Sequence, residues 1–294
     1  MLYNSIRTTS LSLLLTSCLL FLGSSVSAQN TTDGTTHRRD ECGTHVTEDD
    51  IANAELAISR LKLARQASVR EYTFDVHFTI VAANMTERAG WVPDSQIEAQ
   101  MKMLNERYAG TGVSWRHAGT TRVLSRYWHD SIEAGLQQTN DMHSLFRTGK
   151  STTMNVYTVG FTDASLNGYA TLPVNYARNP IEDGVVIFFA TLPGGLSLER
   201  QGGTLIHEAG HWLGLRHTFQ GGCTGVGDGV DDTPPQREEH YGCPIGADTC
   251  PGGEPDPIHN FMDYTSEECR TEFTPGQISL MQKSIAAFRS NSNR

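Results

Sequence analysis

The chemically most informative segment runs from Thr204 to His217 and holds three histidines and a glutamate at fixed spacing. His207 and His211 are four residues apart, so on a helix they lie one turn apart on the same face and can reach one metal ion. Gly214 can adopt the left-handed conformation that ends a helix, which allows the chain to return His217 to the same ion. We predict a zinc site with three histidine ligands and an open fourth position.

Glu208 follows the first of these ligands, so we expect it to contact a water molecule on the metal rather than the metal itself. Zinc lowers the pKa of such a water to ~7, and a neighbouring carboxylate can then act as general base and pass the proton to the leaving group. The alternative is that the histidines are near one another by chance. Five specified residues at fixed offsets coincide in a chain of 294 residues at a frequency on the order of 1 in 10,000.

Strands and helices alternate before this motif. Alternating apolar residues in Glu71–Ala83 predict a strand, at which the folded domain is expected to begin. Apolar spacing predicts a helix over Ser95–Tyr108, capped by Asp94 or Ser95, and an earlier helix within Asp49–Arg70. Further strands are predicted at Val113–His117, Met154–Phe161, Tyr169–Leu172 and Val185–Phe189.

The sequence after His217 is rich in Gly, Pro, Asp and Cys and has little periodicity. Thr274 and Gln277 then predict a capping box at the start of a final helix, with Pro275 in its first turn. Four cysteines lie in this part of the chain and are expected to form two disulfides that stabilise a loop-rich half. They allow three pairings, and their spacing alone does not choose among them. They are Cys223, Cys243, Cys250 and Cys269.

The first 28 residues have the features of an export signal, with Arg7, an apolar run over Leu11–Leu22 and cleavage expected after Ala28. The run is shorter than the ~20 residues that span a bilayer, so we expect a secreted protein without a membrane anchor. Asn30 and Asn84 begin glycosylation sequons. The net charge of -10 and the lack of clustered Lys and Arg argue against a nucleic-acid partner.

The sequence HEAGHWLGLRH, which ends at His217, resembles the long zinc-binding pattern of the metzincins, and Asn260–Tyr264 resembles their Met-turn. The surrounding residues resemble the pappalysin family, in particular fungal secreted extracellular metalloproteases and the bacterial enzyme ulilysin. The resemblance covers roughly residues 42–288. It implies an α/β (α+β) metzincin-like domain with a twisted mixed sheet and two long helices above a cleft. Below the cleft, it implies a disulfide-rich irregular subdomain that ends in a helix.

The resemblance also implies an organisation and an activity. We expect a signal peptide at 1–28, a propeptide at 29–70 and a catalytic domain at 71–294, divided into an upper part (71–217) and a lower part (218–294). The expected reaction is hydrolysis of internal peptide bonds in proteins or peptides. The alternatives are a zinc amidase or exopeptidase, and a secreted binding protein or inactive relative that keeps the metal as a structural element. Side-chain specificity and oligomeric state are not predicted.

Further residues receive roles from the same resemblance. Met262 would lie beneath the metal as an apolar floor. Tyr264 would either lie near the metal and donate a hydrogen bond to the tetrahedral intermediate or only pack there. The implied disulfides pair Cys223 with Cys250 and Cys243 with Cys269.

Cys42, in the segment RRDECGT, resembles the cysteine switch of latent metalloproteases. Its thiolate would occupy the open zinc position. The alternative is a third, intermolecular or glutathione-capped disulfide. Activation would require cleavage downstream of Cys42, for which Arg60, Arg65 and Arg70 are candidates.

Two further features have both a functional and a plain interpretation. Asp228 and Asp231 belong to an acidic, Gly-bearing loop that is either a calcium site, as in pappalysin relatives, or a solvated turn. The strand at Tyr169–Thr171 would be the edge strand over the cleft, to which an extended peptide can add by main-chain hydrogen bonds. An ordinary sheet edge would have the same sequence.

Overall fold

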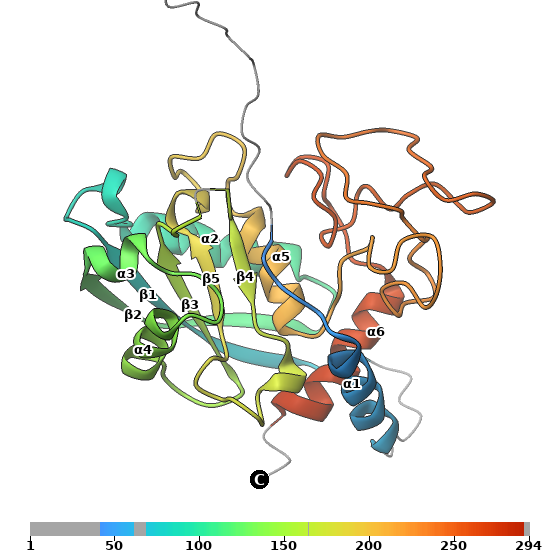
Figure 1. The fold of residues 1–294 in the computed structure, drawn as a ribbon, viewed down its shortest axis with the longest axis horizontal. Helices are drawn as coiled ribbons and strands as arrows, with labels where there is room; N and C mark the ends of the chain where they lie inside the picture. The colour runs from blue at the N-terminus through green and yellow to red at the C-terminus, as the bar shows by residue number, and fades with distance from the viewer. Residues whose placement is uncertain (1–41, 62–68, 164, 291–294) are drawn as a thin grey trace, which may run out of the picture. The chain divides into compact units, whose positions relative to one another are not determined.

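The computed structural model describes residues 42–61, 69–163 and 165–290. The predicted signal peptide and Asn30 lie outside this part of the chain. Within it, five strands form one sheet in the order β2-β1-β3-β5-β4, with β4 as the antiparallel edge strand and the other four parallel (Figure 1). The mixed sheet confirms the predicted fold class. The strands are β1 (Tyr72–Ala82), β2 (Val113–Leu124), β3 (Thr153–Val159), β4 (Gly168–Ala170) and β5 (Val185–Phe188).

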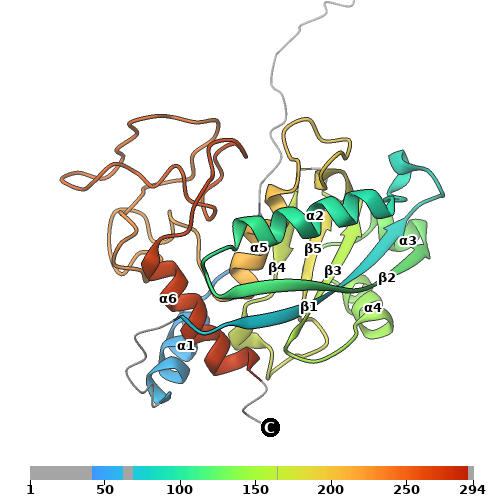
Figure 2. The same ribbon diagram turned by 180° about the vertical axis from the view of Figure 1, so that it is seen from behind.

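Helices cover both faces of the sheet (Figure 2). Side chains alternate along β1, so Phe74 and Phe78 share one core with α2 and α5, whereas Val81 shares the other with Met142 of α4. A sheet buried on both faces explains the nearly continuous apolar sequences of β3 and β5. The helices are α2 (Asp94–Arg107), α3 (Arg126–Asp130), α4 (Gln137–Phe146) and α5 (Gly203–Trp212), with short 3-10 turns at η1 (Glu87–Ala89), η2 (Pro173–Asn175) and η3 (Phe189–Thr191).

Three details differ from the sequence expectations. Pro93, not Asp94 or Ser95, is the N-cap of α2, and the Asp94 carboxylate instead accepts a hydrogen bond from Arg122 at 2.7 Å. β2 continues seven residues beyond His117, because it pairs with β1 along its whole length although this edge of the sheet is partly exposed. α3 and α4 are not among the predicted helices, since both are short and mostly polar.

The N-terminal segment, which we define as Cys42–Leu61, contains helix α1 (Glu48–Arg60). Thr47 and Asp50 form a capping box at its start. The helix packs against η2 and α6. It ends at Arg60, ten residues before the end of the predicted range. Among the described residues, no helix is both long and apolar enough to cross a membrane.

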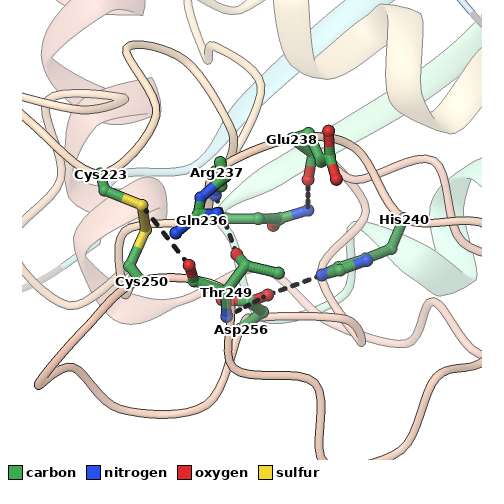
Figure 3. The surroundings of a disulfide bond; sticks show 8 residues. All are labelled: Cys223, Gln236, Arg237, Glu238, His240, Thr249, Cys250 and Asp256. Carbon is green, nitrogen blue, oxygen red and sulfur yellow. Dashed lines mark hydrogen bonds and ion pairs between the residues drawn. A yellow bond between two sulfur atoms is a disulfide. The ribbon is translucent and has the colours of Figure 1, made fainter.

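The chain from Thr218 to Thr274, which we call the irregular segment, contains no helix or extended strand among its described residues. Disulfides join Cys223 to Cys250 and Cys243 to Cys269, which is the pairing that the resemblance implies. Hydrogen bonds made by side chains supplement these disulfides. Figure 3 shows Thr249 accepting from the Arg237 N–H at 3.0 Å and His240 bonded to Asp256 at 2.7 Å, beside the first disulfide.

The last helix, α6 (Pro275–Ser284), begins with the predicted capping box. The Gln277 N–H donates to Thr274 Oγ1 at 3.1 Å, and the Thr274 N–H donates to Gln277 Oε1 at 3.0 Å. One π turn, η4 (Ile285–Arg289), continues the helix. The predicted final helix is therefore confirmed.

A buried ion pair attaches η4 to the rest of the domain. Arg289 is fully buried, its guanidinium lies 3.4 Å from the ring centre of Trp212, and its Nη2 is 2.8 Å from Asp183 Oδ1. Its Nη1 is 3.2 Å from the other Asp183 oxygen, so the contact is bidentate. These contacts join η4 to Trp212, the last residue of α5.

Candidate metal centre

The histidines of the predicted motif come together as their spacing implies. His207 and His211 lie on consecutive turns of α5, and Gly214 has a φ of +101°, the left-handed conformation that ends the helix. The chain then turns back and places His217 against the first two. The Nε2 atom of His211 is 3.1 Å from that of His207 and 3.0 Å from that of His217, and the third separation is 3.2 Å.

The hydrogen bonds of these rings fix which nitrogens face the centre. His207 Nδ1 is 2.7 Å from the carbonyl of Phe261, and His211 Nδ1 is 2.9 Å from that of Leu215. Because a carbonyl only accepts, both Nδ1 atoms carry the proton, and both Nε2 atoms present lone pairs to each other. Lone pairs 3.1 Å apart in a buried site repel, and a shared cation would remove the repulsion.

The site fits a zinc ion by its donor set and its size. With Zn–N bonds of ~2.0 Å, tetrahedral ligands lie about 3.3 Å apart, close to the separations observed. Burial lowers the pKa of His211 to about 4, and burial with the neighbouring rings lowers those of His207 and His217 well below their usual value. All three rings are therefore neutral, the form in which histidine can bind a metal.

Cys42 lies at the same centre. Its Sγ belongs, with the three histidines, to a group of potential ligand atoms that are all within 4.8 Å of one another. The main chain holds it there, because Cys42 forms a β-bridge with Gly168 and the Gly43 N–H donates to the Gly168 carbonyl at 2.8 Å. Burial and the nearby Glu208 carboxylate raise the pKa of the Cys42 thiol. The structure thus brings the predicted switch residue to the predicted ligands.

Glu208 is fully buried beside the histidines. Its Oε2 accepts a hydrogen bond from Thr44 Oγ1 at 3.1 Å and lies 3.5 Å from Cys42 Sγ, while Oε1 has no hydrogen-bond partner among the described residues. Burial raises the pKa of Glu208 to about 8. Thr44, which also exchanges hydrogen bonds with the main chain of Ala170, was not a predicted site residue.

The residues predicted to form a Met-turn lie beside the three histidines. Met262 is fully buried, and its Sδ would be 2.5 Å from a Cβ on Gly210, so a larger residue between the two histidines of α5 would require the Met262 side chain to move. The Tyr264 hydroxyl is 3.3 Å from His217 Nε2 and donates to the Cys42 carbonyl at 3.2 Å. The phenol therefore lies within hydrogen-bond reach of the predicted metal ligands.

Two polar residues of the irregular segment support the centre without belonging to a motif. Glu267 accepts from the N–H groups of Gln201 at 2.6 Å and Gly203 at 2.9 Å, at the start of α5, where no side chain of the helix itself provides a cap. Gln236 bonds both Thr218, next to the last histidine, and Asp263 of the Met-turn. These contacts join residues distant in sequence, so no local pattern indicates them.

The acidic loop does not form a comparable cluster in the structure. Asp228 is buried and accepts from the Val230 N–H at 3.0 Å, whereas Asp231 is exposed. Burial raises the pKa of Asp228 to about 7. Neither residue is in a described group of three or more potential metal ligands. Calcium binding there stays a prediction.

Comparison with known proteins gives consistent matches. The model of the peptidase M43 family, described as pregnancy-associated plasma protein-A, matches residues 149–286. An extracellular metalloprotease of Pyricularia oryzae is 40% identical over 244 residues, which cover 81% of this chain and 83% of that protein. One from Verticillium alfalfae is 41% identical over 253 residues, with coverages of 80% and 85%.

Solved structures match as well. A point mutant of Tannerella forsythia promirolysin superposes with a TM-score of 0.70 at 25% identity, covering 84% of this chain and 94% of that one. Mature mirolysin of the same organism, in complex with a cleaved peptide, gives a TM-score of 0.62 at 26% identity, covering 74% and 92%.

Proposed function

Because the chain belongs to the pappalysin family of metalloproteases, we propose that it is a secreted zinc endopeptidase made as a latent precursor. The observation that carries the proposal is the convergence of the Nε2 atoms of three neutral histidines beside a buried carboxylate, Glu208. Secretion is supported by the predicted signal peptide at 1–28 and by relatives that are named extracellular metalloproteases.

Each residue at the centre has its own role in the proposed hydrolysis of a peptide bond. Zinc held by the three histidines would polarise the scissile carbonyl and acidify a water molecule. Glu208 takes the proton from that water and delivers it to the leaving amine. The Tyr264 hydroxyl donates to the developing oxyanion, a contact worth ~3 kcal/mol in comparable sites. Met262 supports the ligand helix from below.

The edge of β4 supplies a way to hold a substrate by its main chain. The N-terminal segment already uses this edge, through the bond from the Gly43 N–H to Gly168. A substrate that replaces the segment would form such main-chain bonds, which do not depend on side chains. An edge that binds an extended chain favours an endopeptidase over an enzyme that recognises a free terminus.

The metal content tests the proposal. We expect about one zinc per chain in purified protein from which the N-terminal segment has been removed, measured by elemental mass spectrometry. A strong chelator should abolish the hydrolysis of casein, and added zinc should restore it. Undiminished hydrolysis in the chelator, or protein without stoichiometric metal, would refute a zinc peptidase. Cleavage products of a defined peptide distinguish an endopeptidase from an exopeptidase or amidase.

The position of Cys42 supports latency, and we assign the propeptide role to 29–70. The Cys42→Ala precursor should hydrolyse peptides before any cleavage, at least about tenfold faster than the intact wild-type precursor, a factor that corresponds to 1.4 kcal/mol. Ser59→Ala, on the exposed side of α1, is the matched control and should stay latent. Intact mass must show that each precursor is uncleaved.

The competing interpretation of Cys42 gives a different result in the same experiment. If Cys42 forms a mixed or intermolecular disulfide, intact mass of the wild-type precursor shows glutathione or a dimer. A Cys42→Ala precursor as inactive as the wild type would show that the thiol does not maintain latency. Glycosylation at Asn84, which lies exposed, remains a prediction.

A further inference from the structure

A cavity lies beside the β4 edge, and the chemistry proposed above does not use it. Its volume is about 180 Å³, well above the ~10–15 Å³ that is needed to hold one water. The end of β4 and the residues after it form one wall, α4 forms another, and Glu182 lies on a third. Gly43 and His45 of the N-terminal segment complete the lining, so removal of the segment would open the cavity toward the β4 edge.

The lining mixes apolar and polar groups and contains one carboxylate. Glu182 is partly exposed, and among the described residues its carboxylate forms no ion pair. Thr139, Asn140 and Asn175 add neutral hydrogen-bonding groups. His143, at the back, is buried, and burial lowers its pKa to about 4, so it is neutral. Among the described residues, no Lys or Arg lines the cavity.

Two basic groups lie near the cavity without lining it. Arg178 donates to Oδ1 of Asn175, a lining residue, at 2.7 Å, and lines a neighbouring cavity together with Glu182. Arg147 is 3.8 Å from Asp183, the buried partner of Arg289. A cationic group entering the cavity would therefore meet a carboxylate that forms no salt bridge among the described residues, beside several neutral acceptors.

The N-terminal segment runs from the three histidines to this cavity, so its residues measure the distance from the cavity to the expected scissile bond. Cys42 lies at the metal ligands, Gly43 bonds the edge strand, and His45, three residues from Cys42, lines the cavity. A substrate held along the same edge places a side chain there two or three residues from the scissile bond. At about 3.3 Å per extended residue, that separation is about 7–10 Å.

We propose that this cavity is a side-chain subsite of the peptidase and that Glu182 makes it select lysine or arginine two or three residues from the cleaved bond. The inference rests on the proposed peptidase function. It concerns preference rather than catalysis, so Glu182 contributes to kcat/KM only when the substrate carries a basic residue at that position. A carboxylate that is partly exposed gives a preference of about two- to fivefold, as for one surface ion pair.

The test is a cleavage profile of the processed enzyme on a peptide library, followed by kcat/KM for matched peptides with Lys or Gln at the enriched position. We expect a preference for Lys in the wild type, weaker at high salt because charges near the surface are screened. Glu182→Gln should abolish the preference and Glu182→Lys should reverse it toward acidic residues. Peptides with Gln should be cleaved equally by wild type and Glu182→Gln.

Asp141→Asn is the matched control, since this exposed carboxylate of α4 bonds Gln137 and does not line the cavity. It should retain the preference for Lys, and all variants should melt at the wild-type temperature. The same Lys-to-Gln ratio in wild type and Glu182→Gln, or no preference for basic residues within three positions of the bond, overturns the inference alone. Absence of any peptide hydrolysis by the zinc-loaded wild type overturns the proposed function as well.

Discussion

Glu208→Gln is expected to lower kcat by about a thousandfold while the protein keeps its zinc. The amide has nearly the shape of the carboxylate but cannot take a proton from water, and general acid–base catalysis typically contributes ~10²–10⁴. The histidines keep their own contacts, because their Nδ1 atoms donate to the carbonyls of Phe261 and Leu215. Steady-state kinetics on a peptide and elemental analysis of the same preparation measure the two effects.

The control is Glu98→Gln, which alters an exposed carboxylate on α2 and should leave kcat unchanged. A Glu208→Gln enzyme with near wild-type kcat would exclude the glutamate as general base. Loss of zinc together with activity would instead indicate that Glu208 is needed to build the site.

Arg289→Met should destabilise the domain by about 3–5 kcal/mol, because it leaves the Asp183 carboxylate buried without its bidentate partner. Both side chains are almost completely inaccessible, so water cannot replace the lost bonds. For a domain of this size the melting temperature should fall by roughly 10 °C. Thermal unfolding in the Glu208→Gln background avoids self-digestion.

A double variant separates the lost pair from the remaining charge. Arg289→Met with Asp183→Asn removes both charges and should be less destabilised than Arg289→Met alone. Arg126→Met, which breaks an exposed pair with Asp130, should change stability by less than about 0.5 kcal/mol. If Arg289→Met lowered the free energy of unfolding by as little as Arg126→Met, the buried pair would add little to stability.

The convergence of the three histidines was predictable because they are local in sequence. His207, His211 and His217 lie within eleven residues, and Gly214 is the position at which the chain must turn. The strands were predictable for a similar reason, since alternation or a continuous apolar run is visible within five to ten residues. The final helix was predictable from its capping box.

The remaining site residues depend on contacts that no local pattern encodes. Thr44 reaches Glu208 across 164 residues, and Glu267 reaches Gly203 across 64. The subsite residue Glu182 has no motif at all, because a cavity exists only once β4, α4 and the loop before β5 are assembled. α3 was missed because it has only five residues. α4 was missed because its buried face is short and mostly polar, with Met142 as its buried apolar residue, so the sequence has no clear helical period.

The cap on α5 restrains how the protein can move. Glu267 comes from the irregular segment, yet it accepts hydrogen bonds from two backbone N–H groups at the start of the ligand-bearing helix. If the irregular segment moved away from the sheet, the N-terminus of α5, the positive end of its dipole, would lose the Glu267 carboxylate. We therefore expect bulky substrates to bind through local rearrangement of loops rather than through a rigid-body hinge motion of the irregular segment.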